Sequence, residues 1–174
     1  RLDRSLVWRC LCPVQPPGRL MKTLRLTFYV LLVAFLLAAC APKSNEPQPP
    51  EILYGQDLCD ACGMIIDEAR FAAATLLTNG EFRKFDEIGD MMIYHMEHPE
   101  DQVQAYFVHD YKSEAWIRGE TAFFVKGDIT TPMDGNIVAF EDQTEAKAFA
   151  AEVNGEVFTL YDLRVEAHLT VHGG

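Results

Sequence analysis

Positive charge is scarce in this sequence. Residues 41–174 contain nine Lys and Arg against 25 Asp and Glu, so their formal net charge is −16. A surface of this sign repels the phosphates of nucleic acids and anionic lipid headgroups, and it attracts cations and basic patches on other proteins. We therefore expect no nucleic-acid partner, whereas a metal cation or a basic partner protein is compatible with the composition.

A hydrophobic run long enough to cross a bilayer is also lacking. The longest apolar run, Leu26–Ala39, has about 14 residues, whereas a transmembrane helix needs about 20. Lys22 and Arg25 lie just before this run, and small residues end it. The positive start, short apolar segment and small-residue end form the three-part pattern of a secretory signal. An uncleaved signal-anchor helix is the alternative.

A cysteine follows the small residues that end the signal. The segment Leu37-Ala38-Ala39-Cys40 resembles the lipobox of bacterial lipoproteins. This resemblance implies cleavage of residues 21–39 and lipidation of the Cys40 thiol, which would anchor the protein at the periplasmic face of a bacterial membrane. Ala41, rather than an aspartate, comes next, and this favours the outer membrane over the inner one.

The chain divides into segments by composition. Residues 1–20 precede the first methionine and lack periodicity, so we interpret them as an upstream or non-native extension. Residues 40–51 are proline-rich and polar, which is typical of a semi-extended tether. Residues 52–163 have the length of one domain with a modest core, and residues 164–174 are expected to form a loose tail.

The two halves of the domain, residues 52–112 and 113–163, show the same order of patterns. In each half an apolar run leads to a glycine-containing turn, and a phenylalanine followed by an acid comes five residues after the glycine. These pairs are Phe85-Asp86 and Phe140-Glu141. An amphipathic segment and a further β-type run complete each half. The sequence therefore predicts an α+β fold of two ββαβ-like units, with a largely antiparallel sheet and helices packed on one side.

Local signals place the individual elements. Asn79-Gly80 favours a hairpin turn because both residues tolerate positive φ. Asp86 is expected to cap the first helix, and Asp142 or Thr144 the second. The first helix has apolar positions at helical spacing, namely Ile88, Met91, Met92, His95 and Met96. The predicted strands span residues 71–77, 81–85, 103–109, 123–126, 137–140 and 157–161.

Cysteine is limited to five residues, and few of them remain for the folded domain. Cys10 and Cys12 lie in the upstream extension and Cys40 takes the lipid, which leaves Cys59 and Cys62. A disulfide between these two would close a very short loop and add little stability. A thioredoxin-like couple normally opens a helix, whereas glycine and β-branched residues follow this pair and indicate a turn and a strand.

Structural zinc is a third interpretation of the cysteine pair. Zinc sites usually take four Cys or His ligands, and the domain has no second CxxC pair. His95, His98 and His109 are the candidates for the remaining positions. Nothing in their spacing fixes them near the cysteines, so this interpretation has little support from the sequence.

A fourth interpretation also uses the methionine that follows the pair. Thiolate and thioether are soft donors that select Cu(I) among biological metals. Cys62 and Met64 flank Gly63; on an extended backbone side chains at i and i+2 share a face, and the glycine permits a bend. Met133, in the turn at residues 131–135, has no obvious packing role and is a further candidate ligand. The methionines of the first predicted helix are better explained as core residues.

Three segments, together with the lipobox, resemble the NosL family of lipoproteins for nitrous oxide reductase maturation. They are CDACGMII at residues 59–66, KFDEIGDMM at 84–92 and TPMDGNIVAF at 131–140. The resemblance implies that the protein binds one Cu(I) ion in the periplasm and delivers it for assembly of the copper centres of nitrous oxide reductase. It implies an ABC-type membrane transporter as a further partner. It also implies Cys62 and Met64 as copper ligands, with Met133 as a plausible third.

Two functions from different classes follow from these observations. The leading hypothesis is a non-enzymatic, lipid-anchored copper chaperone, in which Cys59 is a ligand, a helper of Cys62 or a redox guard. The alternative is a membrane-anchored thiol–disulfide oxidoreductase that uses Cys59 and Cys62. Only the copper site requires Met64, so this residue distinguishes the two hypotheses.

Overall fold

The computed structural model describes residues 46–173. The expected upstream extension at residues 1–20, the expected signal peptide at 21–39 and the lipidation site Cys40 lie outside these residues. Within the described part, no helix combines the length and the apolar character needed to cross a membrane.

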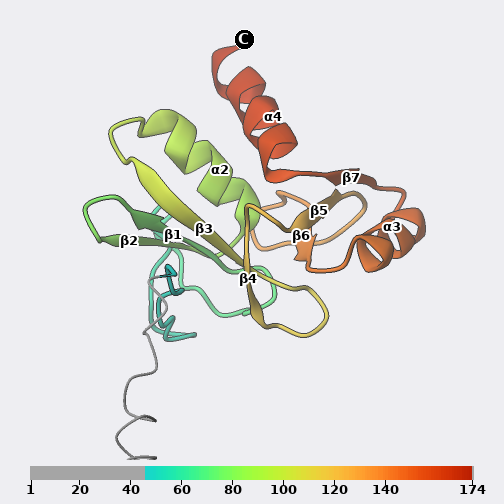
Figure 1. Ribbon diagram of the computed structural model, residues 1–174, viewed down its shortest axis with the longest axis horizontal. Helices are drawn as coiled ribbons and strands as arrows, with labels where there is room; N and C mark the ends of the chain where they lie inside the picture. The colour runs from blue at the N-terminus through green and yellow to red at the C-terminus, as the bar shows by residue number, and fades with distance from the viewer. Residues whose placement is uncertain (1–45, 174) are drawn as a thin grey trace, which may run out of the picture. The chain divides into compact units, whose positions relative to one another are not determined.

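The first half of the domain, joined by an unpredicted strand from the start of the second half, forms a four-stranded antiparallel sheet with one helix. In chain order its elements are β1 (Ala73–Leu77), β2 (Phe82–Phe85), α2 (Ile88–Glu97), β3 (Val103–His109) and β4 (Trp116–Arg118). The strands lie in the order β2-β1-β3-β4, and all neighbours are antiparallel. Helix α2 packs against β1 and β2 (Figure 1). The turn between these two strands contains Gly80 at φ +89°, as the hairpin signal predicts.

The second half repeats this arrangement with a smaller sheet. Its elements are β5 (Phe123–Lys126), β6 (Ile137–Phe140), α3 (Gln143–Glu152) and β7 (Glu156–Phe158). The strand order is β6-β5-β7, again antiparallel. In both halves the first strand is central, with the second strand on one side and the strand after the helix on the other. The predicted α+β fold of two ββαβ units is therefore confirmed.

A short contact between strands joins the two sheets. Asp110, just after β3, forms a parallel bridge with Ala139 of β6. The backbone N–H of Tyr111 donates to Ala139 O at 2.8 Å. The Asp110 carboxylate also accepts a hydrogen bond from Glu141 N at 3.0 Å. The two units are thus connected through backbone groups at the end of β6, close to where α3 begins.

The C-terminal residues differ from the prediction. The expected loose tail at residues 164–174 is instead mostly part of helix α4 (Leu160–His172), and the last strand ends at Phe158 rather than continuing to residue 161. Thr159 starts the helix through a capping box with Asp162, a pattern that is readable in the sequence. Helix α4 buries Leu163 and Ala167 and packs against α2.

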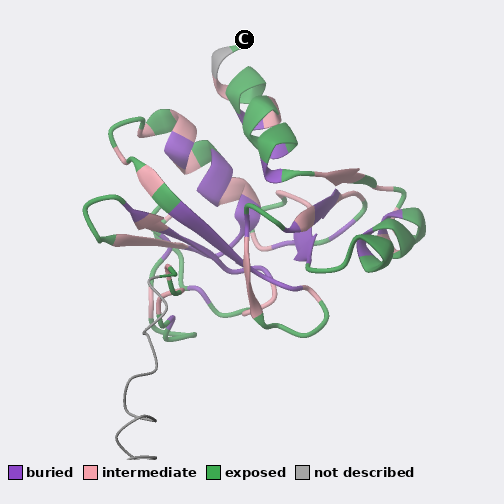
Figure 2. Ribbon diagram, in the orientation of Figure 1, coloured by how far each residue is buried: buried purple, intermediate pink, exposed green. Residues whose placement is uncertain are grey.

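Helix α2 buries the face that its spacing predicts. Ile88, Met91, Met92 and His95 are buried, while Met96 is only partly buried. Figure 2 shows buried residues in the central strands and on one side of α2, with exposed residues on the outer sides of α3 and α4.

The start of α2 corrects one prediction. Glu87, not Asp86, occupies the N-cap position, and no side chain caps the helix. Asp86 is buried, and its carboxylate accepts a hydrogen bond from Cys62 instead of from the first turn of the helix. Because Asp86 bonds to Cys62 rather than capping the helix, its carboxylate lies beside the cysteine pair.

Candidate metal centre

The cysteine pair lies in a compact loop, residues 57–66, that precedes the first sheet. The backbone N–H of Cys59 donates to Met64 O at 2.8 Å, and that of Gly63 donates to Cys59 O at 2.9 Å. Gly63 has a φ of +75°, which glycine adopts without strain. The predicted turn is therefore present, and no helix begins at Cys62.

Two carboxylates hold this loop against strand β2. Asp60 Oδ2 accepts a hydrogen bond from Lys84 N at 2.6 Å, and the Asp60 N–H donates to Lys84 O at 2.8 Å. Lys84 Nζ lies 2.6 Å from Asp57 Oδ2, and this hydrogen bond lowers the pKa of the Asp57 carboxyl. Since Lys84 lies two residues before Asp86, these contacts bring the loop beside the start of α2.

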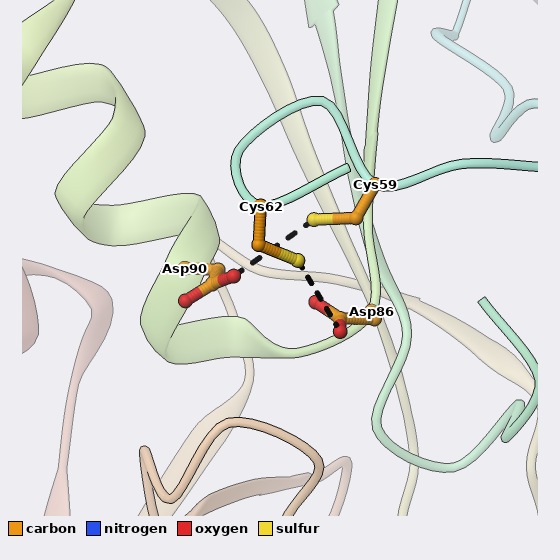
Figure 3. Close-up of side chains that lie close together, drawn as sticks. All are labelled: Cys59, Cys62, Asp86 and Asp90. Atoms are coloured by element: carbon orange, nitrogen blue, oxygen red, sulfur yellow. Dashed lines mark hydrogen bonds between the residues drawn. The ribbon is translucent and has the colours of Figure 1, made fainter. Parts of the chain in front are cut away.

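Two thiols and two carboxyl groups meet at this point. One ligand atom from each of Cys59, Cys62, Asp86 and Asp90 lies within 4.8 Å of all the others. Cys59 Sγ donates to Asp90 Oδ2 at 3.8 Å, and Cys62 Sγ donates to Asp86 Oδ2 at 3.6 Å. Figure 3 shows the two thiols of the loop facing Asp90 on α2 and Asp86 just before the helix. We call these four residues the thiol–carboxyl cluster; its donor set could hold a metal ion.

Burial favours the neutral thiols in this cluster. It raises the pKa of Cys62 to about 12, and the neighbouring Cys59 and Asp86 add to this effect. Burial also raises the pKa of Cys59, and burial together with the charge of Asp86 raises the pKa of Asp90. Asp86 is 3% exposed, and its Oδ1 has no hydrogen-bond partner. A bound cation would offset the negative charges, and its binding would release thiol protons.

Met133 from the second unit lines the same cavity as Cys62. The residues that line this cavity of about 210 Å³ include Cys62, Asp90, His98 and Met133. Met133 is 39% exposed although it is a large apolar residue. The fold therefore brings a thiol and a thioether from opposite units to one opening on the surface.

Buried Glu87 positions the turn that carries Met133. Its Oε2 accepts hydrogen bonds from Met133 N at 3.1 Å and from Gly135 N at 3.3 Å. A Cβ atom at Gly135 would collide with the Glu87 carboxylate, so only glycine permits this approach. Glu87 thus connects the second unit to the start of α2.

Met64 has a different setting from the other candidates. It is 46% exposed and is not among the residues that line the cavity of Cys62 and Met133. The backbone at Gly63 is left-handed, so the expectation that an extended chain places Cys62 and Met64 on one face does not apply. Met64 remains next to the cluster through its hydrogen-bonded carbonyl and its neighbour Gly63.

The histidines considered for zinc have other partners. His95 Nε2 lies 2.9 Å from Thr75 Oγ1, and His109 Nδ1 lies 2.7 Å from Glu114 O. His98 lines the cavity of Cys62, but within residues 46–173 no histidine belongs to the group of possible metal ligands at the cysteines. A zinc site built from the cysteine pair and these histidines is not assembled in this fold.

Three acidic residues of this site, Asp86, Asp90 and Glu87, were not predicted from the sequence to belong to it. Asp86 was interpreted as a helix cap, and Asp90 and Glu87 were not singled out. The acidic run at residues 86–90 was a local signal, but Asp86 precedes the N-cap of α2 and therefore lies outside the helical spacing that would pair it with Asp90. No local signal identified the partners of Glu87, since they come from a turn far along the chain.

Comparison with known proteins gives a consistent result. The sequence model of the NosL family matches residues 50–168. No curated protein matches the sequence. Among solved structures, the copper chaperone NosL from Shewanella denitrificans is similar, with a TM-score of 0.59 and 23% sequence identity over 67% of this chain and 96% of that chain. This similarity supports the fold, and the family match extends from the end of the tether into α4. The chain belongs to the NosL family.

Proposed function

We propose that this protein is a copper chaperone that carries one Cu(I) ion at Cys62, Met133 and Met64. The observation that carries the proposal is the shared cavity of Cys62 and Met133. Thiolate and thioether are the donors that Cu(I) prefers, and two or three of them suffice. Copper is cargo here rather than a resident cofactor, so the protein needs no catalytic residues.

The thiol–carboxyl cluster suits reversible loading of the ion. Without a cation the Cys62 thiol is protonated, because its pKa is raised to about 12. Cu(I) would displace this proton, and the carboxylate of the nearby Asp86 would offset the charge of the metal. Cys59, 3% exposed and hydrogen bonded to Asp90, lies behind Cys62 and would act as a second thiol donor.

The surroundings of the loop suit transfer to a partner protein. Leu58 and Ile65 form an isolated bridge beside the CxxC turn, and they are 59% and 53% exposed. With the exposed Met64 they place apolar surface next to the site, and such surface commonly marks a protein contact. Two exposed methionines also leave the copper shell open, so a donor from the partner can displace them stepwise.

Membership of the NosL family supports a proposal for the partners and the location. We propose that the copper is delivered for assembly of the copper centres of nitrous oxide reductase, with an ABC-type transporter of the membrane taking part. Lipidation at Cys40 would hold the protein at the periplasmic face of the membrane, the outer membrane being favoured by Ala41. The acidic surface would orient it on a basic patch of a partner.

An anaerobic Cu(I) titration against a competing chelator tests the binding site. We expect one tightly bound equivalent, and Cys62→Ser should weaken binding by more than about 100-fold, because losing an outer-shell group alone costs about 10- to 100-fold. Met133→Leu and Met64→Leu should each cause a smaller loss. Met96→Leu, a methionine of α2 outside the cavity, is the matched control and should bind like the wild type. Unchanged affinity in Cys62→Ser would refute the proposal.

The thiol–disulfide oxidoreductase is the second candidate, because the two free thiols lie within 4.8 Å of each other. Its weakness is the raised pKa of Cys62, since a redox-active thiol of this kind normally has a lowered pKa. An oxidoreductase would turn over a dithiol substrate and would tolerate Met133→Leu. Turnover that depends on both cysteines, without tight Cu(I) binding, would favour this candidate over the chaperone.

A further inference from the structure

A second, larger cavity lies at the opposite end of α2 from the thiol–carboxyl cluster. Its volume is about 500 Å³, within the range of sites for small organic ligands. The walls come from the last turn of α2, the loop that follows it, strand β3 and helix α4. The polar residues at these walls are His95, Asp101, Gln102, Tyr106, Arg164 and His168.

Arg164 differs from most Lys and Arg residues of this protein because it forms no ion pair with a carboxylate among residues 46–173. The described residues include eight Lys and Arg, and six of them form ion pairs with carboxylates. Arg164 and Lys147 are the two that form none among residues 46–173. Arg164 is exposed, and in a chain with so many acidic residues a guanidinium at a cavity wall without a carboxylate partner is available to an anion.

The charge of Arg164 reaches the buried wall of this cavity. Burial raises the pKa of Tyr106, and the positive charge of Arg164 opposes that rise. Burial lowers the pKa of His95 to about 4, and Arg164 contributes in the same direction. Asp101 also lines the cavity, but its carboxylate is 2.9 Å from Arg83 Nε and accepts a hydrogen bond from Tyr94. The carboxylate of Asp101 is therefore already paired, whereas Arg164 forms no ion pair with a carboxylate among residues 46–173.

His95 supplies an independent indication of a ligand. It is 8% exposed, and its Nε2 lies 2.9 Å from Thr75 Oγ1, but its buried Nδ1 has no hydrogen-bond partner. Buried polar atoms are nearly always paired, so such an atom at a cavity wall needs an explanation. If Thr75 donates to Nε2, the neutral ring carries its proton on Nδ1, as a buried donor without an acceptor among residues 46–173, in a residue that lines the cavity.

We propose that this cavity binds a small organic anion, with its carboxylate or phosphate group at the Arg164 guanidinium. The Tyr106 hydroxyl would donate a second hydrogen bond, and the imidazoles of His95 and His168 would complete the polar wall. The cavity is larger than the anionic group alone requires, so the remainder of the ligand would lie along Met96 and Val103. This site shares no residue with the cavity of Cys62 and Met133, so the inference does not depend on copper binding.

Isothermal titration of the purified chain tests the proposal with three probes. They are citrate, glycerol 3-phosphate and vesicles that contain phosphatidylglycerol; the soluble probes and the vesicles distinguish a free anion from a lipid headgroup. We expect saturable binding of at least one probe. Arg164→Gln should weaken it by about 10-fold or more, because charge-assisted hydrogen bonds are the strong ones. Tyr106→Phe should weaken it less.

Lys147→Gln is the matched control, because it removes the other unpaired cation, which lies on α3. It should leave binding of the probes unchanged, and Arg164→Gln should leave the circular dichroism spectrum and the Cu(I) titration unchanged. A rise in the pKa of His95 when the probe is added, followed by NMR of the imidazole, would support the site directly. Absence of saturable binding of all three probes, or equal losses in Arg164→Gln and Lys147→Gln, would overturn the proposal.

Discussion

The two ββαβ units have the same topology, but their helices begin in different ways. Helix α3 has Asp142 at its N-cap, and its carboxylate accepts hydrogen bonds from Thr144 N at 2.7 Å and Glu145 N at 3.0 Å. Helix α2 has Glu87 at the same position, and its carboxylate reaches away from the helix to the turn of Met133.

The residue before the N-cap also differs between the two units, in its burial and its contacts. Glu141 of the second unit is exposed, whereas Asp86 of the first is buried and faces Cys62. A side-chain cap typically contributes about 1 kcal/mol, and α2 forgoes it. The second unit therefore keeps the side-chain cap that stabilises a helix start, whereas the first unit lacks it where its acidic residues build a site.

The largest expected effect concerns a buried group that only the first unit contains. Counted from the N-cap, His95 of α2 corresponds to Ala150 of α3, and burial lowers the pKa of His95 to about 4. The unfolded chain binds the proton near pH 6.5, so between these values it holds more protons than the folded chain. Stability should therefore fall as the pH falls through this range, by on the order of 3 kcal/mol in total.

Denaturant titrations near pH 6.5 and near pH 4.5 measure this loss. His95→Gln cannot titrate but keeps a group that can hydrogen bond to Thr75, so it should lose less stability than the wild type over the same interval. Carboxylates that titrate in both proteins cancel in the difference. Parallel losses in the two proteins would show that His95 is not the acid-sensitive group.

A smaller change in the free energy of unfolding is expected when either N-cap residue, Glu87 or Asp142, is replaced by alanine. Glu87→Ala should cost about 2 kcal/mol, because it leaves two backbone N–H groups without their charged acceptor. It should also weaken Cu(I) binding, since the turn of Met133 is released. Asp142→Ala should cost about 1 kcal/mol and leave Cu(I) affinity unchanged. Urea denaturation and the Cu(I) titration report both quantities, and equal Cu(I) affinities in the two variants would contradict the positioning role of Glu87.

The smallest expected effect is a change in the pKa of Cys62 when the residue before the N-cap of α2 is substituted. The negative charge of Asp86 adds to the burial that raises the pKa of Cys62 to about 12. Asp86→Asn should therefore lower the pKa of Cys62, whereas Glu141→Gln should leave it unchanged. The pH dependence of the thiolate absorbance, measured in a Cys59→Ser background to isolate one thiol, distinguishes them. An unchanged or higher pKa in Asp86→Asn would show that burial alone sets this value.

Much of the fold was predictable because its signals are local. The Asn79-Gly80 turn, the helical spacing of Ile88 to His95 and the matching order of the two halves predicted the ββαβ units. The CxxC segment was correctly interpreted as a turn for the same reason, since Gly63 and the residues after it do not favour a helix. Helix α4 was missed although the Thr159 and Asp162 capping box was visible, because apolar and polar residues alternate from 163 to 171 and do not follow the helical period.

The functional groups of the site can be read from the sequence: two thiols, the methionines Met64 and Met133, and acidic residues at a helix start. Which of these groups meet depends on the tertiary structure. Asp86 and Asp90 join the cysteines because Lys84 holds the loop against β2, and Met133 joins Cys62 because Glu87 binds the turn of the second unit. Turn chemistry and periodicity act over a few residues, whereas these contacts depend on how two units pack, which no short stretch of sequence encodes.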